Sequence, residues 1–150
     1  MTSPLKIGYV NVHGLNHSNW KVVCSLLDTG SFDFLFLAET WYVNHERHIK
    51  DKRLIATTVR PPSTGLRIGR DKGGIYLLAT RQARNRIRGE ISITDESITF
   101  GIGKQRISGV YFPPSLSEDR LKHCLKSIST STIILGDINT RFVDSEYQKG

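Results

Sequence analysis

The residues of this chain best suited to chemistry come directly after an apolar run near its carboxyl end. Residues 131–140 read STIILGDINT, so the apolar run is followed by Gly136 and then by Asp137 and Asn139. We expect the run to form a buried strand, and side chains two positions apart in extended backbone point the same way. A carboxylate and an amide facing one spot can accept a proton and donate hydrogen bonds to an anion.

Two earlier segments are built in the same way. Residues 5–12 alternate apolar with small or polar residues and bring Asn11 to the end of an expected first strand. Residues 32–38 form a nearly continuous apolar run, typical of a strand buried on both faces, and Glu39 follows it directly. Because α/β proteins keep their chemistry at the carboxyl ends of strands, we expect these side chains to converge on one site.

Helical patterns alternate with these strands. Asn16 or Ser18 can cap a helix that ends at residues 29–30, and Ser115 with Glu118 has capping-box spacing ahead of a second helix. Further strands are expected at residues 54–59, 73–79, 86–93, 97–102 and 107–112. The order predicts an α/β fold built on one mixed sheet with flanking helices.

Composition limits the class of protein. The 150 residues are 38% hydrophobic, and no apolar run approaches the roughly 18 residues of a membrane span. We therefore expect one globular domain over residues 1–150, an intracellular location with the nucleus as one option, and no membrane partner. Cys24 and Cys124 lack C-x-x-C spacing and stand in apolar helical contexts, so we expect buried free thiols.

The positive charge is concentrated in one segment. Residues 60–88 contain eight basic residues and one acidic residue, an excess equal to the net charge of +7 of the whole chain. A local basic patch favours a polyanion such as nucleic acid, although a solvated basic face is the simpler alternative. The candidate nucleic-acid-binding residues are Arg70, Lys72, Arg84, Arg86 and Arg88.

Three features of the sequence leave alternatives open. Arg84, Arg86 and Arg88 would share one face of extended chain, either as a row for phosphates or as a charged edge strand that resists aggregation. Gly73 and Gly74 permit a close backbone approach or a bulge, or form a simple turn. The spacing of His45 and His48 fits a solvated loop better than a zinc site.

At this point several motifs together resemble one family, the endonuclease/exonuclease/phosphatase superfamily. The likeness is to the endonuclease domain of non-LTR retrotransposons, which is similar to apurinic/apyrimidinic endonucleases. The motifs are, in order, Asn11 in YVNVHGL, Glu39 in LAETW, the Gly73-Gly74 pair, Tyr111 in GVYFPP and the GDIN of residues 136–139. Each alone is weak, but five in order over most of the chain are a strong signal.

The resemblance implies a role for each matching residue. Glu39 would hold a divalent cation, Mg²⁺ or Mn²⁺, and Asp137 would activate the attacking water or protonate the leaving group. Asn11, Asn139 and Tyr111 would position and stabilise the phosphate. These roles agree with the chemistry, since phosphodiester hydrolysis needs a hard cation on oxygen ligands together with a proton acceptor.

The resemblance stops before the end of the family pattern. The family closes with a Ser-Asp-His motif, which residues 140–150 do not contain. We therefore expect half of a two-sheet α/β sandwich, weak or inactive alone, whose exposed sheet face would be covered by a C-terminal half or by a second copy. Two functions remain: a Mg²⁺-dependent endonuclease acting on DNA in preference to RNA, or a non-catalytic nucleic-acid-binding or regulatory module. His13 lies near the end of the first strand and could approach the site, but we do not include it among the site residues.

Overall fold

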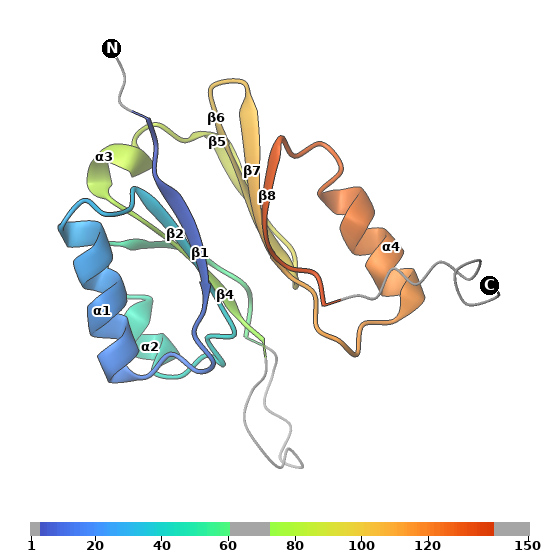
Figure 1. Cartoon of the computed structure of the whole chain (residues 1–150), viewed down its shortest axis with the longest axis horizontal. Helices are drawn as coiled ribbons and strands as arrows, with labels where there is room; N and C mark the ends of the chain where they lie inside the picture. The colour runs from blue at the N-terminus through green and yellow to red at the C-terminus, as the bar shows by residue number, and fades with distance from the viewer. Residues whose placement is uncertain (1–3, 61–72, 140–150) are drawn as a thin grey trace, which may run out of the picture.

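The computed structural model describes residues 4–60 and 73–139, which form two four-stranded sheets with helices on their outer sides (Figure 1). The first sheet has the strand order β1-β2-β4-β3 and the second has the order β5-β6-β7-β8. The strands are β1 (Ile7–Asn11), β2 (Phe34–Ala38), β3 (Leu54–Thr57), β4 (Ile75–Ala79), β5 (Arg88–Ile93), β6 (Ser97–Ile102), β7 (Gln105–Tyr111) and β8 (Ile133–Asp137). The expected α/β sandwich is confirmed. The expectation of a single mixed sheet is wrong, because these strands divide between two sheets.

Each sheet contains a pair of parallel strands joined through a helix. Helix α1 (His17–Asp28) connects β1 to β2, and helix α4 (Glu118–Ser127) connects β7 to β8. Asn16 caps α1 by accepting from the Asn19 backbone N–H at 2.8 Å, whereas α4 is capped by Ser117 and not by the expected Ser115. In register, Asn11 pairs with Ala38 and Tyr111 pairs with Asp137, so both crossovers bring strand carboxyl ends to one end of the sandwich.

The inner faces of the two sheets bury one another. Phe34 and Phe36 of β2 lie against Phe100 of β6, with ring centroids 4.6 Å and 5.9 Å apart. Gly109 of β7 leaves room for the Phe36 ring, which a β-carbon at that position would overlap. This close approach fixes how the sheets face each other, and each buried phenylalanine contributes about 1.5–3 kcal/mol through the loss of apolar surface from water.

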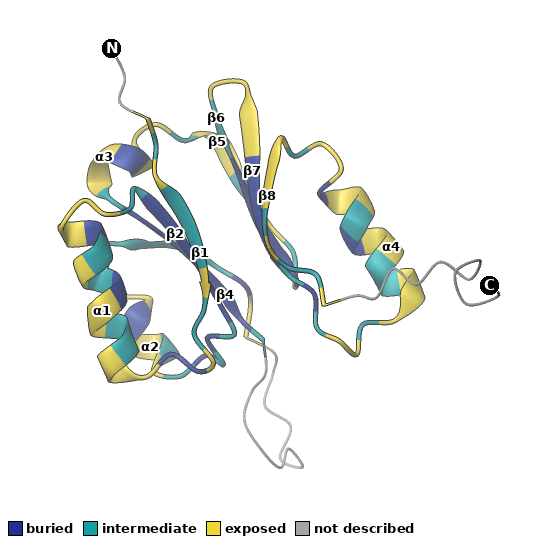
Figure 2. Cartoon of the chain, in the orientation of Figure 1, coloured by how far each residue is buried: buried dark blue, intermediate teal, exposed yellow. Residues whose placement is uncertain are grey.

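Exposed apolar side chains of the strands lie at the sheet edges. The central strands β2 and β4 are buried throughout (Figure 2). Among the described strands, the large apolar residues that remain exposed are Val10, Ile93, Ile133 and Ile134, which belong to the edge strands β1, β5 and β8. Ile133 and Ile134 are consecutive residues on opposite faces of β8, so this edge strand is open on both faces, and the expectation that its apolar run is buried is wrong.

Smaller features of the sequence have mixed outcomes. Cys24 and Cys124 are both free, as expected, and Cys124 is the buried residue of α4 while Cys24 in α1 is only half-buried. No helix of the described chain is long and apolar enough to cross a membrane. Arg84 ends the short helix α3 (Arg81–Arg84), so it does not share an extended face with Arg86 and Arg88, and the expected row is wrong.

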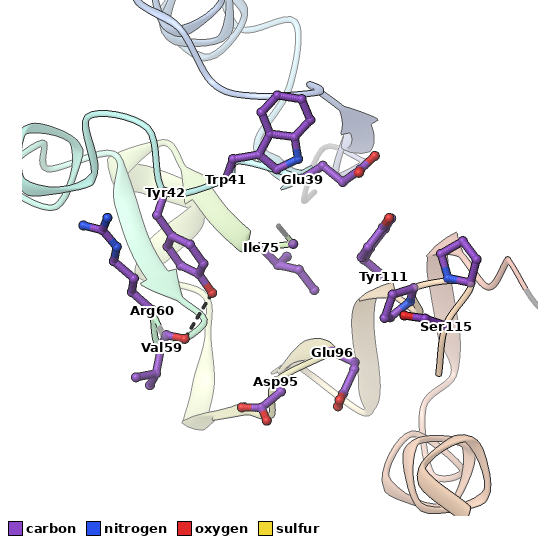
Figure 3. Close-up of a pocket in the computed structure, with 14 residues that line it drawn as sticks. Glu39, Trp41, Tyr42, Val59, Arg60, Ile75, Asp95, Glu96, Tyr111 and Ser115 are labelled. Carbon is purple, nitrogen blue, oxygen red and sulfur yellow. Dashed lines mark hydrogen bonds between the residues drawn. The ribbon is translucent and has the colours of Figure 1, made fainter. Parts of the chain in front are cut away.

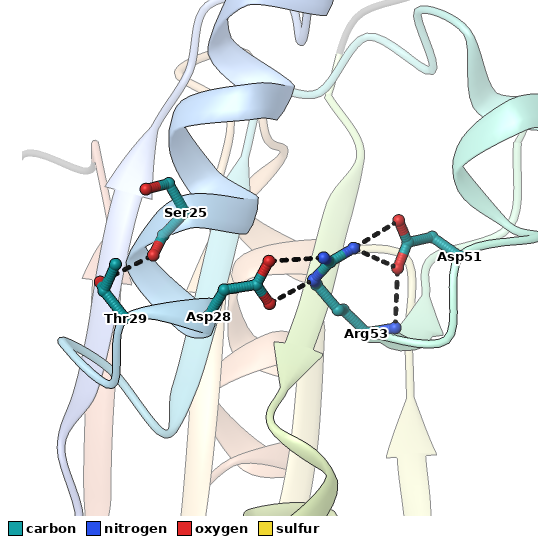
Figure 4. Close-up of polar contacts among 5 residues, drawn as sticks. All are labelled: Ser25, Asp28, Thr29, Asp51 and Arg53. Carbon is teal, nitrogen blue, oxygen red and sulfur yellow. Dashed lines mark hydrogen bonds and ion pairs between the residues drawn. The ribbon is translucent and has the colours of Figure 1, made fainter.

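An arginine joins α1 to the turn that precedes β3. The Arg53 guanidinium donates to both carboxylate oxygens of Asp28 at 2.9 and 2.6 Å, and also to Asp51 at 2.9 Å (Figure 4). The hydrogen bonds from Arg53 hold the pKa of the Asp28 carboxyl below its usual value. Two segments that are distant in sequence are thereby held together on the outer side of the first sheet.

The outer side of the first sheet also buries a histidine. His48, in the short helix α2 (His45–His48), is 3% exposed and stacks on Trp20 with ring centroids 4.1 Å apart. Its Nδ1 has no hydrogen-bond partner among the described residues. Burial, assisted by the nearby His45 and Arg47, lowers the pKa of His48 to about 4. The expected solvated loop is therefore wrong for this residue, which is part of the core.

We predict that acid destabilises the fold through His48. The unfolded chain binds a proton at this side chain near pH 6.5 and the folded chain only near pH 4, so stability falls as the pH decreases between these values. The loss from this group should be on the order of 3 kcal/mol. Urea unfolding at pH 7.0, 5.5 and 4.5 should show a shallower pH dependence for His48→Gln than for the wild type. The exposed control His123→Gln should keep the wild-type dependence, and an unchanged dependence in His48→Gln would refute the assignment.

Candidate functional site

Four side chains named from the sequence meet where the two sheets come together. Asn11 ends β1, Glu39 follows β2, Tyr111 ends β7 and Asp137 ends β8. The first two belong to one sheet and the last two to the other, so the site exists only because the sheets face each other. Strand ends that are far apart in the sequence therefore supply a single group of polar side chains.

Asn11 connects the two carboxylates. Its Nδ2 donates to Glu39 Oε2 and lies 3.4 Å from Asp137 Oδ2, and its Oδ1 accepts from the backbone N–H of His13 at 3.0 Å. An amide can serve both functions because it carries donors and an acceptor together. The Asn11 side chain is thus fixed in orientation, with its donors toward the acids.

Tyr111 supplies a hydroxyl beside the same acids. Figure 3 shows this hydroxyl pointing toward Glu39 across the pocket. Burial, and then the negative charge and hydrogen bonding of Glu39, raise the pKa of Tyr111 to about 12. Tyr111 is therefore protonated at neutral pH and offers an O–H donor. Burial, with the charge of Asp137, likewise raises the pKa of Tyr9 on β1.

Glu39 is held in an unusual backbone conformation by the loops around it. Its φ is 52°, and its carbonyl accepts from the Gly14 N–H at 2.7 Å. The next two backbone N–H groups, of Thr40 and Trp41, donate to the carbonyls of Gly74 and Gly73 at 3.2 and 2.9 Å. A β-carbon on Gly74 would overlap Thr40 Oγ1, so Gly74 serves a close approach, whereas a β-carbon on Gly73 would meet no atom. These contacts orient the Glu39 carboxylate into the site.

A pocket of about 890 Å³ opens beside Glu39 and Tyr111 (Figure 3). Val59 and Pro113 line it with apolar surface, and Glu96 lies in the turn between β5 and β6. Glu96 is neutralised by Arg120, whose guanidinium donates to both carboxylate oxygens at 2.8 and 2.6 Å. The volume is within the range of pockets that hold small organic ligands.

The donor set suits a hard cation that keeps much of its water. In the part of the chain that the structure describes, no group of three or more histidine, cysteine or acidic side chains could enclose a metal ion. Mg²⁺ commonly binds through one or two carboxylates and completes its shell with water and phosphate oxygens. Glu39, with Asp137 close by, fits that pattern.

Other residues named from the sequence lie elsewhere. Asn139 is exposed just beyond β8 with φ 47°, so the extended spacing expected with Asp137 is not kept. Arg84, Arg86 and Arg88 are exposed and lie at the opposite end of the sandwich, since Arg88 pairs with Gly101, which pairs with Arg106 near the start of β7, while Tyr111 is the last residue of β7. Arg70 and Lys72 lie outside the described residues.

The sequence patterns undervalued two residues of the site. The Nδ1 atom of His13 lies 3.4 Å from Glu39 Oε2. The only signal of this contact in the sequence was that His13 follows closely after Asn11. Gly136 has φ 148°, and a β-carbon there would overlap the carbonyl oxygen of Val110 on β7. Its position between an apolar run and Asp137 was the available signal.

Comparison with known proteins identifies the fold. No family model matches the sequence, and no curated protein matches it. Over 94% of its length the chain superposes on the 3′ phosphatase NExo from Neisseria, solved with a product DNA hairpin, with a TM-score of 0.55 and 15% identity. The fold is of the endonuclease/exonuclease/phosphatase type. An AP endonuclease from Archaeoglobus fulgidus matches 91% of the chain with a TM-score of 0.50 and 16% identity.

The chain spans 60% of the Neisseria enzyme and 58% of the Archaeoglobus enzyme. The described strands thus correspond to part of the endonuclease/exonuclease/phosphatase fold as those two enzymes have it. That part includes strands of both sheets and the strand ends that carry Asn11, Glu39, Tyr111 and Asp137.

We predict that Gly136 is required to present Asp137. Gly136→Ala should lower the free energy of unfolding by about 1–3 kcal/mol, because the new β-carbon meets the Val110 carbonyl at a backbone angle unfavourable to side chains. Gly101→Ala in β6 is the matched control, since a β-carbon there makes ordinary contacts, the nearest at 3.4 Å. Urea unfolding measures both variants, and equal stability would contradict the strain assigned to Gly136.

Proposed function

We propose that this chain belongs to a divalent-metal-dependent nuclease that hydrolyses phosphodiester bonds of nucleic acid, of the type found in non-LTR retrotransposons. The observation that carries the proposal is the Asn11 side chain between Glu39 and Asp137 at the meeting of the two sheets. Two carboxylates so placed repel each other unless a cation or a hydrogen-bond donor lies between them. A site built this way is suited to a metal-bound phosphate.

Glu39 would hold the metal ion, Mg²⁺ or Mn²⁺, and Asp137 contacts the same Asn11 amide as Glu39. The bound cation would neutralise charge that develops on the phosphate oxygens. Both ions accept oxygen ligands, which matches the carboxylates and amides present.

The remaining steps use the chain's own groups. Asp137 accepts a proton from the attacking water or returns one to the leaving oxygen. Tyr111, which keeps its proton at neutral pH, donates its O–H to a phosphate oxygen, and Asn11 donates an N–H from the other sheet. Asn139 would add a third donor at the exposed end of β8.

DNA is the proposed partner, ahead of RNA. The Neisseria neighbour was solved with a product DNA hairpin, and the concentrated positive charge of residues 60–88 suits a polyanion. The exposed arginines of residues 81–88 lie at the far end of the sandwich, so they would contact a different stretch of the duplex from the one at Asp137.

The second candidate is a nucleic-acid-binding module that does not cut. The separation of the basic surface from the acidic site favours it, because binding at one end of the sandwich does not require chemistry at the other. The two candidates differ in one property, which is cleavage that depends on Asp137.

We predict slow plasmid nicking by the chain in molar excess with Mg²⁺ or Mn²⁺. Asp137→Asn should reduce the rate by about 10²- to 10⁴-fold, because the proton acceptor is removed. Asp119→Asn, on the exposed face of α4, is the matched control and should nick like the wild type. DNA binding without nicking at any protein excess would favour the binding module. Equal nicking by wild type and Asp137→Asn would refute the proposed active site.

We also predict that the basic surface binds the phosphate backbone without reading sequence. Changing Arg84, Arg86 and Arg88 to Ser should flatten the plot of log affinity against log salt for a generic duplex, by about 0.9 for each phosphate that the protein no longer neutralises. Changing the exposed Lys104, Lys122 and Lys126 to Ser removes the same charge from other surfaces and should alter the slope less. Equal slopes in the two triple variants would mean that the arginines form only a solvated face.

A further inference from the structure

We propose that a pocket at the end of the sandwich opposite the carboxylates binds a nucleoside monophosphate, either free or as the phosphorylated end of a nucleic-acid strand. The pocket has a volume of about 790 Å³ and lies where α1 ends, β2 begins and β4 leads into α3. It is a different site from the proposed active site and does not depend on it. Its charged lining residues are Asp28, Asp33, Lys52, Arg53, Arg81 and Arg84.

The pocket is well separated from the proposed active site. Asp33 lines the pocket directly before β2, whereas Glu39 directly follows the other end of the same strand. At about 3.3 Å per residue, the extended chain between these two residues spans about 20 Å. A single nucleotide bound in the pocket would therefore leave Glu39 untouched.

The acids of the pocket are already engaged within the protein. Both carboxylate oxygens of Asp28 accept from the Arg53 guanidinium, at 2.9 and 2.6 Å (Figure 4). Asp33 accepts from the backbone N–H of Lys6 at 2.8 Å, and the Lys6 ammonium donates to the Gly30 carbonyl at 3.1 Å. The other cations of the lining are consequently left to interact with a ligand.

Three of the lining cations have no partner within the described chain. Over residues 4–60 and 73–139, the side chains of Lys52, Arg81 and Arg84 make no ion pair and no hydrogen bond. All three are exposed, and the lining carries two more positive than negative side chains. Because a cleft lined mainly by one sign of charge concentrates the electric field, this pocket favours an anionic ligand.

The arrangement of the cations favours a phosphate monoester. Arg81 and Arg84 are at i and i+3 of α3, so they lie on the same side of that helix. Their guanidinium groups match phosphate oxygens with paired N–H donors, and Lys52 adds a compact ammonium. A phosphate monoester carries about 1.5 to 2 negative charges at neutral pH and a phosphodiester carries about one, so the monoester better matches the excess charge of the lining.

The pocket is larger than a phosphate group alone requires. Its volume is within the range of sites that hold small organic ligands. Its inner wall is apolar, since Leu27 and Ala79 are only 2% and 3% exposed. Gln82, an exposed lining residue of α3, offers an amide that can hydrogen-bond a sugar or a base. A nucleoside attached to the phosphate would fill the remaining space.

The simpler account is a solvated basic groove that attracts any anion. Such a groove would bind ligands in proportion to their charge, whether or not they end in a phosphate monoester. It would also lose the same affinity when any exposed cation of the surface is removed. A specific site differs in both respects, because it requires the terminal phosphate and particular side chains.

The first experiment locates the ligand and tests the need for its phosphate. Deoxyadenosine 5′-monophosphate is titrated into the ¹⁵N-labelled chain at low salt without divalent metal, and backbone amide shifts are followed. The nucleotide should bind saturably and shift the amides of Gly30, Arg81 and Gln82 but not that of Asn11. Inorganic phosphate should shift the same amides. Deoxyadenosine should bind at least about 10-fold more weakly, because it lacks the charged group that the cations contact.

The second experiment removes the cations. The double variant Lys52→Gln with Arg81→Gln should weaken nucleotide binding at least about 10-fold. The double variant Lys104→Gln with Arg106→Gln is the matched control, because it removes the same charge from exposed positions outside the pocket. The control should bind the nucleotide within about twofold of the wild type, since distant surface charges contribute little.

A 5′-phosphorylated tetranucleotide distinguishes the two sources of the phosphate. If it binds as tightly as the mononucleotide, the pocket holds a strand end, and if it does not bind, the pocket holds free nucleotides; the inference stands in both cases. Equal weakening in the two double variants, or equal affinity for deoxyadenosine and its monophosphate, would indicate a solvated groove and overturn the inference. Shifts at Asn11 in place of Gly30 would put the nucleotide at the carboxylates, which overturns the inference and leaves the proposed function intact.

Discussion

The hydrogen bonding of Asn11 is the interaction on which the site depends. Its amide places donors between carboxylates that come from different sheets, and it also holds the backbone of the next loop. Without a donor there, Glu39 and Asp137 would repel each other across a space that burial makes less tolerant of charge. One neutral side chain therefore allows two acids to be close before any ion is bound.

That placement requires the sheets to meet at a fixed distance and rotation. The Phe36 ring against Gly109 and the phenylalanine cluster around Phe100 set the separation of the inner faces. The two parallel crossovers then bring the strand ends to one side. The geometry of the site consequently depends on the packing of the core. A bulkier residue at Gly109 would separate the sheets and, with them, the ends of β1 and β8.

The sequence predicted most of the strands because their patterns are local. The apolar runs of β2 and β8 and the turn before Ser97 are set by neighbouring residues, and the α/β class follows from their order. The division into two sheets could not be predicted, because it depends on which distant strands pair. The same holds for His48, whose polar neighbours in sequence indicated a loop while Trp20 buries it from another helix. The position of Asn139 was predicted wrongly for a local reason. Its left-handed backbone interrupts the alternation of side chains assumed for extended chain.

The edge strands β1 and β8 both end at the site, so a change at either edge can change the geometry of the site. The Asn11 and Asp137 side chains that span the sheets lie at the ends of these same two edge strands, and Val10, Ile133 and Ile134 leave apolar surface on them. A segment that paired with either edge would shift a strand whose end carries a side chain of the site. Its binding would therefore change the spacing between Glu39 and Asp137. By reciprocity, a ligand that fixed that spacing would strengthen pairing at the edges. Pairing at the edges and ligand binding at the site would then be coupled through the distance between the ends of β1 and β8.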